Sequence, residues 1–195
     1  MSANDILVID NFIPKSAQDE ISNLCFSPGM GWYFNHSAGY SKEVMEQVKL
    51  PDNTLDVFQF THRVIDEGKI LSSSYPIFGH LITALPFSNV VVKRIKLNLT
   101  TRVASFKEYN FGSPHTDHGL EHSDNYMTAI YYVNDSDGDT IIFNESTLGA
   151  NLTVKQRITP KKGRIVIFDG HVLHSPSNPI VNDLRCVVNL NFITE

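Results

Sequence analysis

The sequence predicts a mainly β (α+β) fold, in which residues 90–195 form a β sandwich or barrel and residues 1–89 form a helical support region. The second half of the chain contains many short β-branched or alternating segments, and clusters of Gly, Pro, Asn and Asp separate them. The first half has apolar residues at helical spacing instead. Hydrophobic residues make up 42% of the 195 positions, which suffices for one sizeable core. We therefore expect a single domain over residues 1–195.

Seven segments of the second half have the strand pattern. They are residues 90–99, 103–111, 126–133, 140–143, 152–158, 164–168 and 185–192. No helical pattern lies between them, and many short strands in succession are typical of a sandwich or barrel.

Three apolar stripes with helical spacing occur in the first ninety residues. They are Ala17, Ile21, Leu24 and Cys25 within residues 16–25; Leu55, Phe58, His62 and Ile65; and Ile77, Phe78, Leu81, Ile82 and Leu85, which precede Pro86. Each stripe must be buried against another element. We expect these helices to pack on the outer sheet.

The charge balance argues against two classes of partner. The net charge is −5 and the isoelectric point is near 5.9, so no excess of positive charge attracts DNA or membrane phosphate. The N-terminus lacks a basic region followed by an apolar run, and no apolar stretch is long enough for a membrane span. We expect a soluble, cytoplasmic protein that binds a small molecule or a peptide, with no nucleic acid or membrane as partner. The sequence does not set the oligomeric state.

The two cysteines lie far apart in the sequence. Cys25 belongs to the first helical stripe and Cys186 to the last strand segment, and neither has a zinc-binding spacing. We expect both to be reduced core residues. A disulfide between them is the less favoured alternative in a chain without an export signal.

A short polar run, His115-Thr116-Asp117, carries the main functional signal. In extended backbone, side chains two residues apart leave the same face, so His115 and Asp117 can converge on one ion. Two imidazoles and one carboxylate can occupy one face of an octahedral Fe(II) and leave three positions open. On the motif alone, a solvated loop is the competing interpretation, because polar residues are mostly exposed.

The third ligand must come from a distant strand. His174 qualifies because it follows the β-branched segment 164–168 and the Asp169-Gly170 turn. His171 is the rival. The two histidines are an odd number of residues apart, so in extended backbone only one of them can point inward.

Further pieces of the second half occur in a characteristic order around this motif. They are Tyr109-Asn110-Phe111-Gly112, Thr128 to Asn134, Gly138-Asp139-Thr140, Pro160 to Arg164, Phe168, His174 and Arg185. With the His-x-Asp motif, they resemble the iron(II)- and 2-oxoglutarate-dependent dioxygenases, in their prolyl 4-hydroxylase-like branch, from about residue 94 to residue 193.

This resemblance implies a double-stranded β-helix, a jelly-roll of two packed sheets with iron at one mouth. It implies that Fe(II), 2-oxoglutarate and O2 take part, with ascorbate as a candidate reductant, and that release of succinate and CO2 accompanies hydroxylation of a C–H bond. It assigns His115, Asp117 and His174 as catalytic metal ligands. The family's spacing to the later basic residue favours His174 over His171. Retention of Asp117 favours hydroxylation over halogenation.

The resemblance also implies a set of co-substrate residues. Arg185 would grip the distal carboxylate of 2-oxoglutarate, for which a guanidinium fork is well shaped. Tyr132 would donate to the same carboxylate, Thr128 would line that pocket, and Tyr109 would reach the co-substrate. From the pattern alone, Arg185 could instead lie on a solvated face. Thr128 and Tyr132 could likewise be a packing pair in one strand.

The primary substrate is the least determined feature. The polar segment 118–125 lies beside the metal motif, and its His118 and His122 are either exposed loop residues or part of a substrate-side lid that also contains Glu121 and Asp124. We expect a prolyl residue or an amino acid as substrate, with a nucleobase or small metabolite as alternatives. The rival classes are a non-catalytic jelly-roll module and a zinc hydrolase, and the latter would not use Arg185, Tyr132 and Thr128 together.

Overall fold

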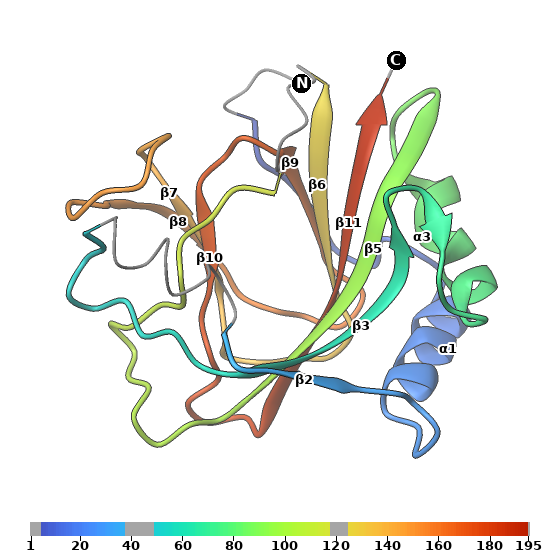
Figure 1. Cartoon of the computed structure of the whole chain (residues 1–195). Helices are drawn as coiled ribbons and strands as arrows, with labels where there is room; N and C mark the ends of the chain where they lie inside the picture. The colour runs from blue at the N-terminus through green and yellow to red at the C-terminus, as the bar shows by residue number, and fades with distance from the viewer. Residues whose placement is uncertain (1–4, 38–48, 118–124, 195) are drawn as a thin grey trace.

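The computed structural model describes residues 5–37, 49–117 and 125–194. Its elements, in chain order, are β1 (Leu7–Ile9), α1 (Lys15–Cys25), β2 (Tyr33–Asn35), β3 (Gln59–Asp66), β4 (Lys69–Ile70), the 3-10 helix η1 (Tyr75–Phe78), α3 (Gly79–Ala84), β5 (Val90–Thr101), β6 (Tyr126–Tyr132), β7 (Thr140–Phe143), β8 (Val154–Ile158), β9 (Ile165–Asp169), β10 (His174–Pro176) and β11 (Leu184–Thr194). Figure 1 shows them as two facing sheets with the helices on one side.

The larger sheet has eight strands in the order β1-β9-β6-β11-β5-β3-β2, with β4 paired to β3. The smaller sheet has the order β10-β7-β8. Every described pairing between these strands is antiparallel. This is the jelly-roll that the sequence predicts.

The helices cover the face of the larger sheet that points away from the smaller one (Figure 1). Their buried side chains include Ile21 of α1, Phe78 of η1 and Leu81 of α3, which share one cluster with Ile95 and Leu190 of the sheet. The prediction of helices on an outer sheet is therefore confirmed for the first and third apolar stripes.

A second cluster fills the space between the two sheets. Its members come from both sheets and are Ile130, Tyr132, Ile142, Ile158, Val166, Phe168 and Val187. Strand β11 contributes to both clusters, because alternate side chains leave opposite faces of a strand. Cys186, Val188 and Leu190 face the helices, whereas Arg185, Val187 and Asn189 face the interior of the jelly-roll.

Two predicted elements are wrong. The second apolar stripe, with Phe58 and Ile65, does not form a helix, because residues 59–66 are β3 and bond to β5 on one side and β2 on the other. Pairing within the sheet overrides a spacing that fits a helix by coincidence. Residues 103–111 are not a strand: two turns follow the end of β5, and only Phe111 forms a bridge, with Thr54.

Residues 1–89 are also not purely helical. β1 pairs with β9, and β3 pairs with β5, so the first part of the chain adds strands to the larger sheet. The expected division at residue 90 therefore does not separate a helical layer from a β layer. These pairings place β1 and β3 in the same sheet as the strands of the second half.

Candidate metal and co-substrate site

Two histidines and one aspartate converge between the sheets. The possible ligand atoms of His115, Asp117 and His174 all lie within 4.8 Å of one another. The backbone brings them together: His115 and His174 exchange N–H···O bonds of 2.8 and 2.9 Å, and the Asp117 N–H donates to Gly170 O at 3.1 Å. The short strand β10 thus holds the distant histidine against the His-x-Asp segment.

Both imidazole rings are held by a hydrogen bond between Nδ1 and a backbone carbonyl oxygen. The Nδ1 atom of His115 lies 2.9 Å from Ser113 O, and that of His174 lies 3.0 Å from Val172 O. A carbonyl oxygen can only accept, so each Nδ1 carries the hydrogen and each Nε2 presents a lone pair. Burial and the neighbouring His174 lower the pKa of His115 to about 4, which keeps its ring neutral at pH 7. Neutral imidazole is the form that binds a metal.

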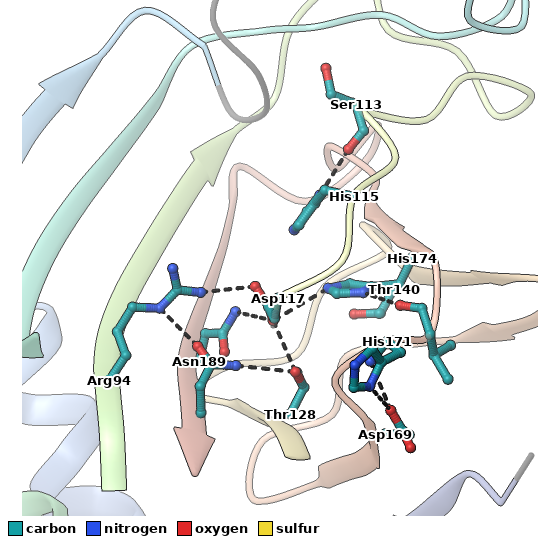
Figure 2. Close-up of polar contacts among 12 residues, drawn as sticks. Arg94, Ser113, His115, Asp117, Thr128, Thr140, Asp169, His171, His174 and Asn189 are labelled. Carbon is teal, nitrogen blue, oxygen red and sulfur yellow. Dashed lines mark hydrogen bonds and ion pairs between the residues drawn. The ribbon is translucent and has the colours of Figure 1, made fainter. Parts of the chain in front are cut away.

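The Asp117 carboxylate accepts hydrogen bonds from three side chains (Figure 2). Arg94 donates to Oδ1 at 2.8 Å, and Asn189 and Thr128 donate to Oδ2 at 3.0 and 3.2 Å. Burial alone would raise the pKa of Asp117, but His174, Arg94 and His115 hold this pKa well below its usual range. The carboxylate is therefore ionised and fixed in orientation.

His171 lies outside this cluster, as Figure 2 shows. Its Nδ1 is 2.8 Å from Asp169 Oδ1, and the ring lines a different surface hollow with Ile6 and Glu145. Of the two candidates for the third ligand, the structure places only His174 beside His115 and Asp117.

A cavity of about 260 Å³ opens beside the three residues. Its wall is formed largely by β5 and β11, whose inward side chains run in register from Thr100 opposite Arg185 to Lys96 opposite Asn189. This volume lies just below the common range of about 300–1,000 Å³ for ligand pockets, which suits small ligands.

Arg185 lines the cavity and is 3% exposed. Its Nη2 donates to Thr140 Oγ1 at 2.8 Å, and Tyr132 OH donates to the same oxygen at 2.7 Å. Its Nε is buried without a hydrogen-bond partner among the described residues. A buried guanidinium with an unused donor is the complement of a ligand carboxylate.

A glycine makes room for this arginine. A Cβ atom added at Gly138 would lie 2.7 Å from Ser177 O and 3.0 Å from Arg185 Cδ. The absence of a side chain at Gly138 therefore leaves space for Arg185. Thr140, in the same segment, accepts the hydrogen bond that orients the guanidinium.

The family comparison agrees with this geometry. A family model described as the 2OG-Fe(II) oxygenase superfamily matches residues 102–193, the part of the chain that contains the three converging residues and Arg185. This match spans 92 of the 195 residues, just under half of the chain. Together with the three converging residues, it indicates a 2-oxoglutarate-dependent oxygenase. No curated protein matches the chain.

Three solved structures with this fold are distant in sequence. An oxidoreductase of the 2OG-Fe(II) oxygenase family from Burkholderia pseudomallei is 12% identical, and the match covers 96% of this chain and 84% of that one with a TM-score of 0.66. The α-ketoglutarate-dependent epimerase SnoN of nogalamycin biosynthesis is 12% identical over 98% of this chain and 78% of that one, with a TM-score of 0.59. A prolyl hydroxylase from Trichoplax adhaerens, in complex with a hypoxia inducible factor peptide fragment, is 13% identical over 98% and 84%, with a TM-score of 0.57. At these identities the likeness shows the fold alone.

Two residues expected to contact the co-substrate of this oxygenase lie elsewhere. Thr128 is fully buried and bonds to Asp117 and Asn191, so it supports the carboxylate and does not line the cavity. Tyr109 is 67% exposed and lines another surface hollow with Arg157 and Val181. The turn that ends at Asn110 holds Tyr109 away from the cavity, because Lys107 O accepts from Asn110 N.

Sequence reasoning missed four residues of the oxygenase site. Arg94, Lys96 and Asn189 line the cavity near Asp117, and Thr140 lines it beside Arg185. Burial lowers the pKa of Lys96 to about 8. One signal was present in the sequence: Arg94, Lys96 and Asn98 alternate with apolar residues in a long strand, which places these polar side chains on one face.

His118 and His122, with the suggested lid, lie outside the described residues. Among the residues that are described, no helix is long and apolar enough to cross a membrane.

Proposed function

We propose that this chain is a hydroxylase in which His115, Asp117 and His174 hold Fe(II) and Arg185 binds the distal carboxylate of 2-oxoglutarate. The observation that carries the proposal is the pair of imidazoles, each anchored through Nδ1 to a backbone carbonyl, beside an ionised carboxylate whose Oδ2 is 3.6 Å from His174 Nε2. The same cavity is lined by Arg185. Two histidines and one carboxylate with open positions are the donor set of non-haem Fe(II) oxygenases.

The iron, when bound, supplies the activation of O2 that couples oxidative decarboxylation of 2-oxoglutarate, to succinate and CO2, with hydroxylation of the substrate. The protein supplies geometry and charge. Arg94, Asn189 and Thr128 fix the carboxylate of Asp117, and Thr140 with Tyr132 fixes the guanidinium of Arg185. Donors held in place before the ligand arrives do not have to reorganise when it binds.

We further propose a prolyl residue or an amino acid as the primary substrate, with proline as the first candidate. The prolyl 4-hydroxylase-like order of motifs supports this choice, as does the shared fold with the Trichoplax enzyme bound to a peptide. A small metabolite is the second candidate, because SnoN, an epimerase of nogalamycin biosynthesis, has the same fold.

Anaerobic titration tests the metal and co-substrate assignment. Fe(II) and 2-oxoglutarate added together should give the weak visible charge-transfer band of a chelated keto acid. His115→Ala, Asp117→Ala and His174→Ala should each abolish the band. His171→Ala is the matched control and should retain it, because that ring is bonded to Asp169. Loss of the band in His171→Ala with retention in His174→Ala would show that the third ligand is wrongly assigned.

A further inference from the structure

The residues that line the cavity carry more positive charge than the contacts between them neutralise. Three of its lining residues are cationic, namely Arg94, Lys96 and Arg185, and one is anionic, Asp117. Arg94 is bonded to Asp117 and Asn191, and Arg185 is oriented by Thr140 toward the co-substrate end. The side chain of Lys96 forms no hydrogen bond or ion pair with any residue that the structure describes.

The strand register places Lys96 away from Arg185. Thr100 lies opposite Arg185, and Lys96 lies opposite Asn189, so the two cations are four residues apart along the pairing, or roughly 13 Å. Asn189 also bonds to Asp117. Lys96 therefore lies beside the metal ligands, on the side away from the carboxylate clamp. Lys96 is therefore not part of the guanidinium clamp proposed for the distal carboxylate of 2-oxoglutarate.

Two unused acceptors accompany the ammonium group. The side chain of Asn189 donates through Nδ2 to Asp117. The Oδ1 atom of Asn189 is buried and has no hydrogen-bond partner in the described part of the chain. The Oδ1 atom of Asn98, the next inward residue of β5, is in the same state. Buried polar atoms are normally paired, so unpaired ones in a cavity wall indicate a ligand that supplies the partner.

We propose that Lys96 binds the carboxylate of the primary substrate, and that Asn189 and Asn98 accept hydrogen bonds from its amino or imino group. The substrate would then be a free amino acid, or a similar small molecule, and not a residue within a peptide chain. A residue inside a peptide has no carboxylate of its own to offer Lys96. A partly buried ammonium gains most from such a partner, because a charge away from water is costly unless it is paired. This inference rests on the proposed function and narrows its substrate class.

Paired ligands test the inference. Free L-proline and the other free L-amino acids are compared with their carboxamides, which keep the amino group and lack the carboxylate charge. Binding is measured by anaerobic calorimetry on protein loaded with Fe(II) and 2-oxoglutarate. At least one free amino acid should bind, at least tenfold more tightly than its carboxamide. Lys96→Met should remove this preference, Lys96→Arg should retain most of it, and Lys69→Met, at an exposed position on β4, should not change it.

Three outcomes would overturn the inference. One is binding of capped prolyl peptides with no binding of any free amino acid in the set. Another is an unchanged preference in folded Lys96→Met. The third is a loss of 2-oxoglutarate affinity in Lys96→Met as large as in Arg185→Ala, which would assign Lys96 to the co-substrate. Failure of the charge-transfer band to form in the wild type would instead contradict the proposed function itself, so the two failures are distinguishable.

Discussion

Two buried threonines support opposite ends of the site. Thr128 donates to the carboxylate of Asp117, whereas Thr140 accepts from both Arg185 and Tyr132. Both are fully buried, and both are replaceable by valine with loss of little more than the hydroxyl group. They therefore allow the metal end and the co-substrate end to be perturbed separately.

We predict that Thr128→Val lowers the affinity for Fe(II) by about tenfold, because loss of a group that orients a metal ligand typically costs 10–100-fold. Its affinity for 2-oxoglutarate at saturating metal should not change. Thr140→Val should show the reverse, with an unchanged metal affinity and an affinity for 2-oxoglutarate about tenfold lower, equivalent to about 1.4 kcal/mol. Separate metal and co-substrate titrations check this. If both variants lose the same affinity, the two ends are not independent.

The roles expected of His115, Asp117, His174 and Arg185 came from the resemblance to a family, because the residue pattern alone also fits a solvated loop and a solvated strand face. The structure brings all four residues to one cavity. The role of Thr128 could not be predicted, since a hydroxyl has many uses and its partner Asp117 is reached only through the fold. Tyr109 lies away from the cavity because a turn, and not a strand, carries that residue.

At the scale of elements, the strands with the most burial were the most predictable. β6, β7 and β9 are buried along almost their whole length, and their apolar runs have no other interpretation. β3 was missed because its apolar residues also fit a helical spacing, and its pairing with β5 depends on residues far away in sequence. β1, β2 and β10, at three residues each, are too short to leave a periodic signal.

The carboxylate of Asp137 holds residues 180–182, the loop that leads into β11. Asp137 Oδ2 accepts from Ile180 N and Val181 N at 2.9 and 2.8 Å, and Oδ1 accepts from Asn182 N at 2.9 Å. Burial raises the pKa of Asp137, but these three backbone donors hold it below its usual value overall. The segment that leads into Arg185 is thereby fixed.

We predict that Asp137→Asn destabilises the protein by about 1–3 kcal/mol at pH 7, because an amide oxygen replaces a charged acceptor of three hydrogen bonds. The folded-state pKa of Asp137 is depressed, so its contribution is fully present above the unfolded value of about 3.9 and is lost as the pH falls through the folded value. Urea unfolding at several pH values checks both points. A difference between the two proteins that stays constant from pH 7 to below pH 3 would contradict the assignment.

At the scale of the whole molecule, the two faces of the larger sheet have different roles, packing on one side and ligand binding on the other. One face packs against α1, η1 and α3, and the other carries the cavity, so stability and ligand binding draw on different side chains of the same strands. This division follows from the alternation of side chains along β5 and β11.

We predict that Ile21→Ala, in the fully buried face of α1, lowers the free energy of unfolding by about 2–5 kcal/mol. The folded variant should bind Fe(II) and 2-oxoglutarate with unchanged affinity. Val154→Ala, at a residue of β8 that is 42% exposed, is the control and should cost far less. Denaturant unfolding and ligand titration below the melting temperature check this. Weaker ligand binding by folded Ile21→Ala would show that the helical layer is coupled to the site.

We expect the imbalance of charge along the cavity wall to make the binding of metal and 2-oxoglutarate interdependent. A divalent metal ion adds positive charge to a cavity whose described wall already has three cationic groups and one anionic group. Each bound anion relieves that repulsion, so 2-oxoglutarate should tighten the hold on the metal, and by thermodynamic reciprocity the metal should tighten the hold on 2-oxoglutarate by the same factor. The surplus cations thus favour an assembled complex over any partly filled one, which discourages retention of iron when no co-substrate is present.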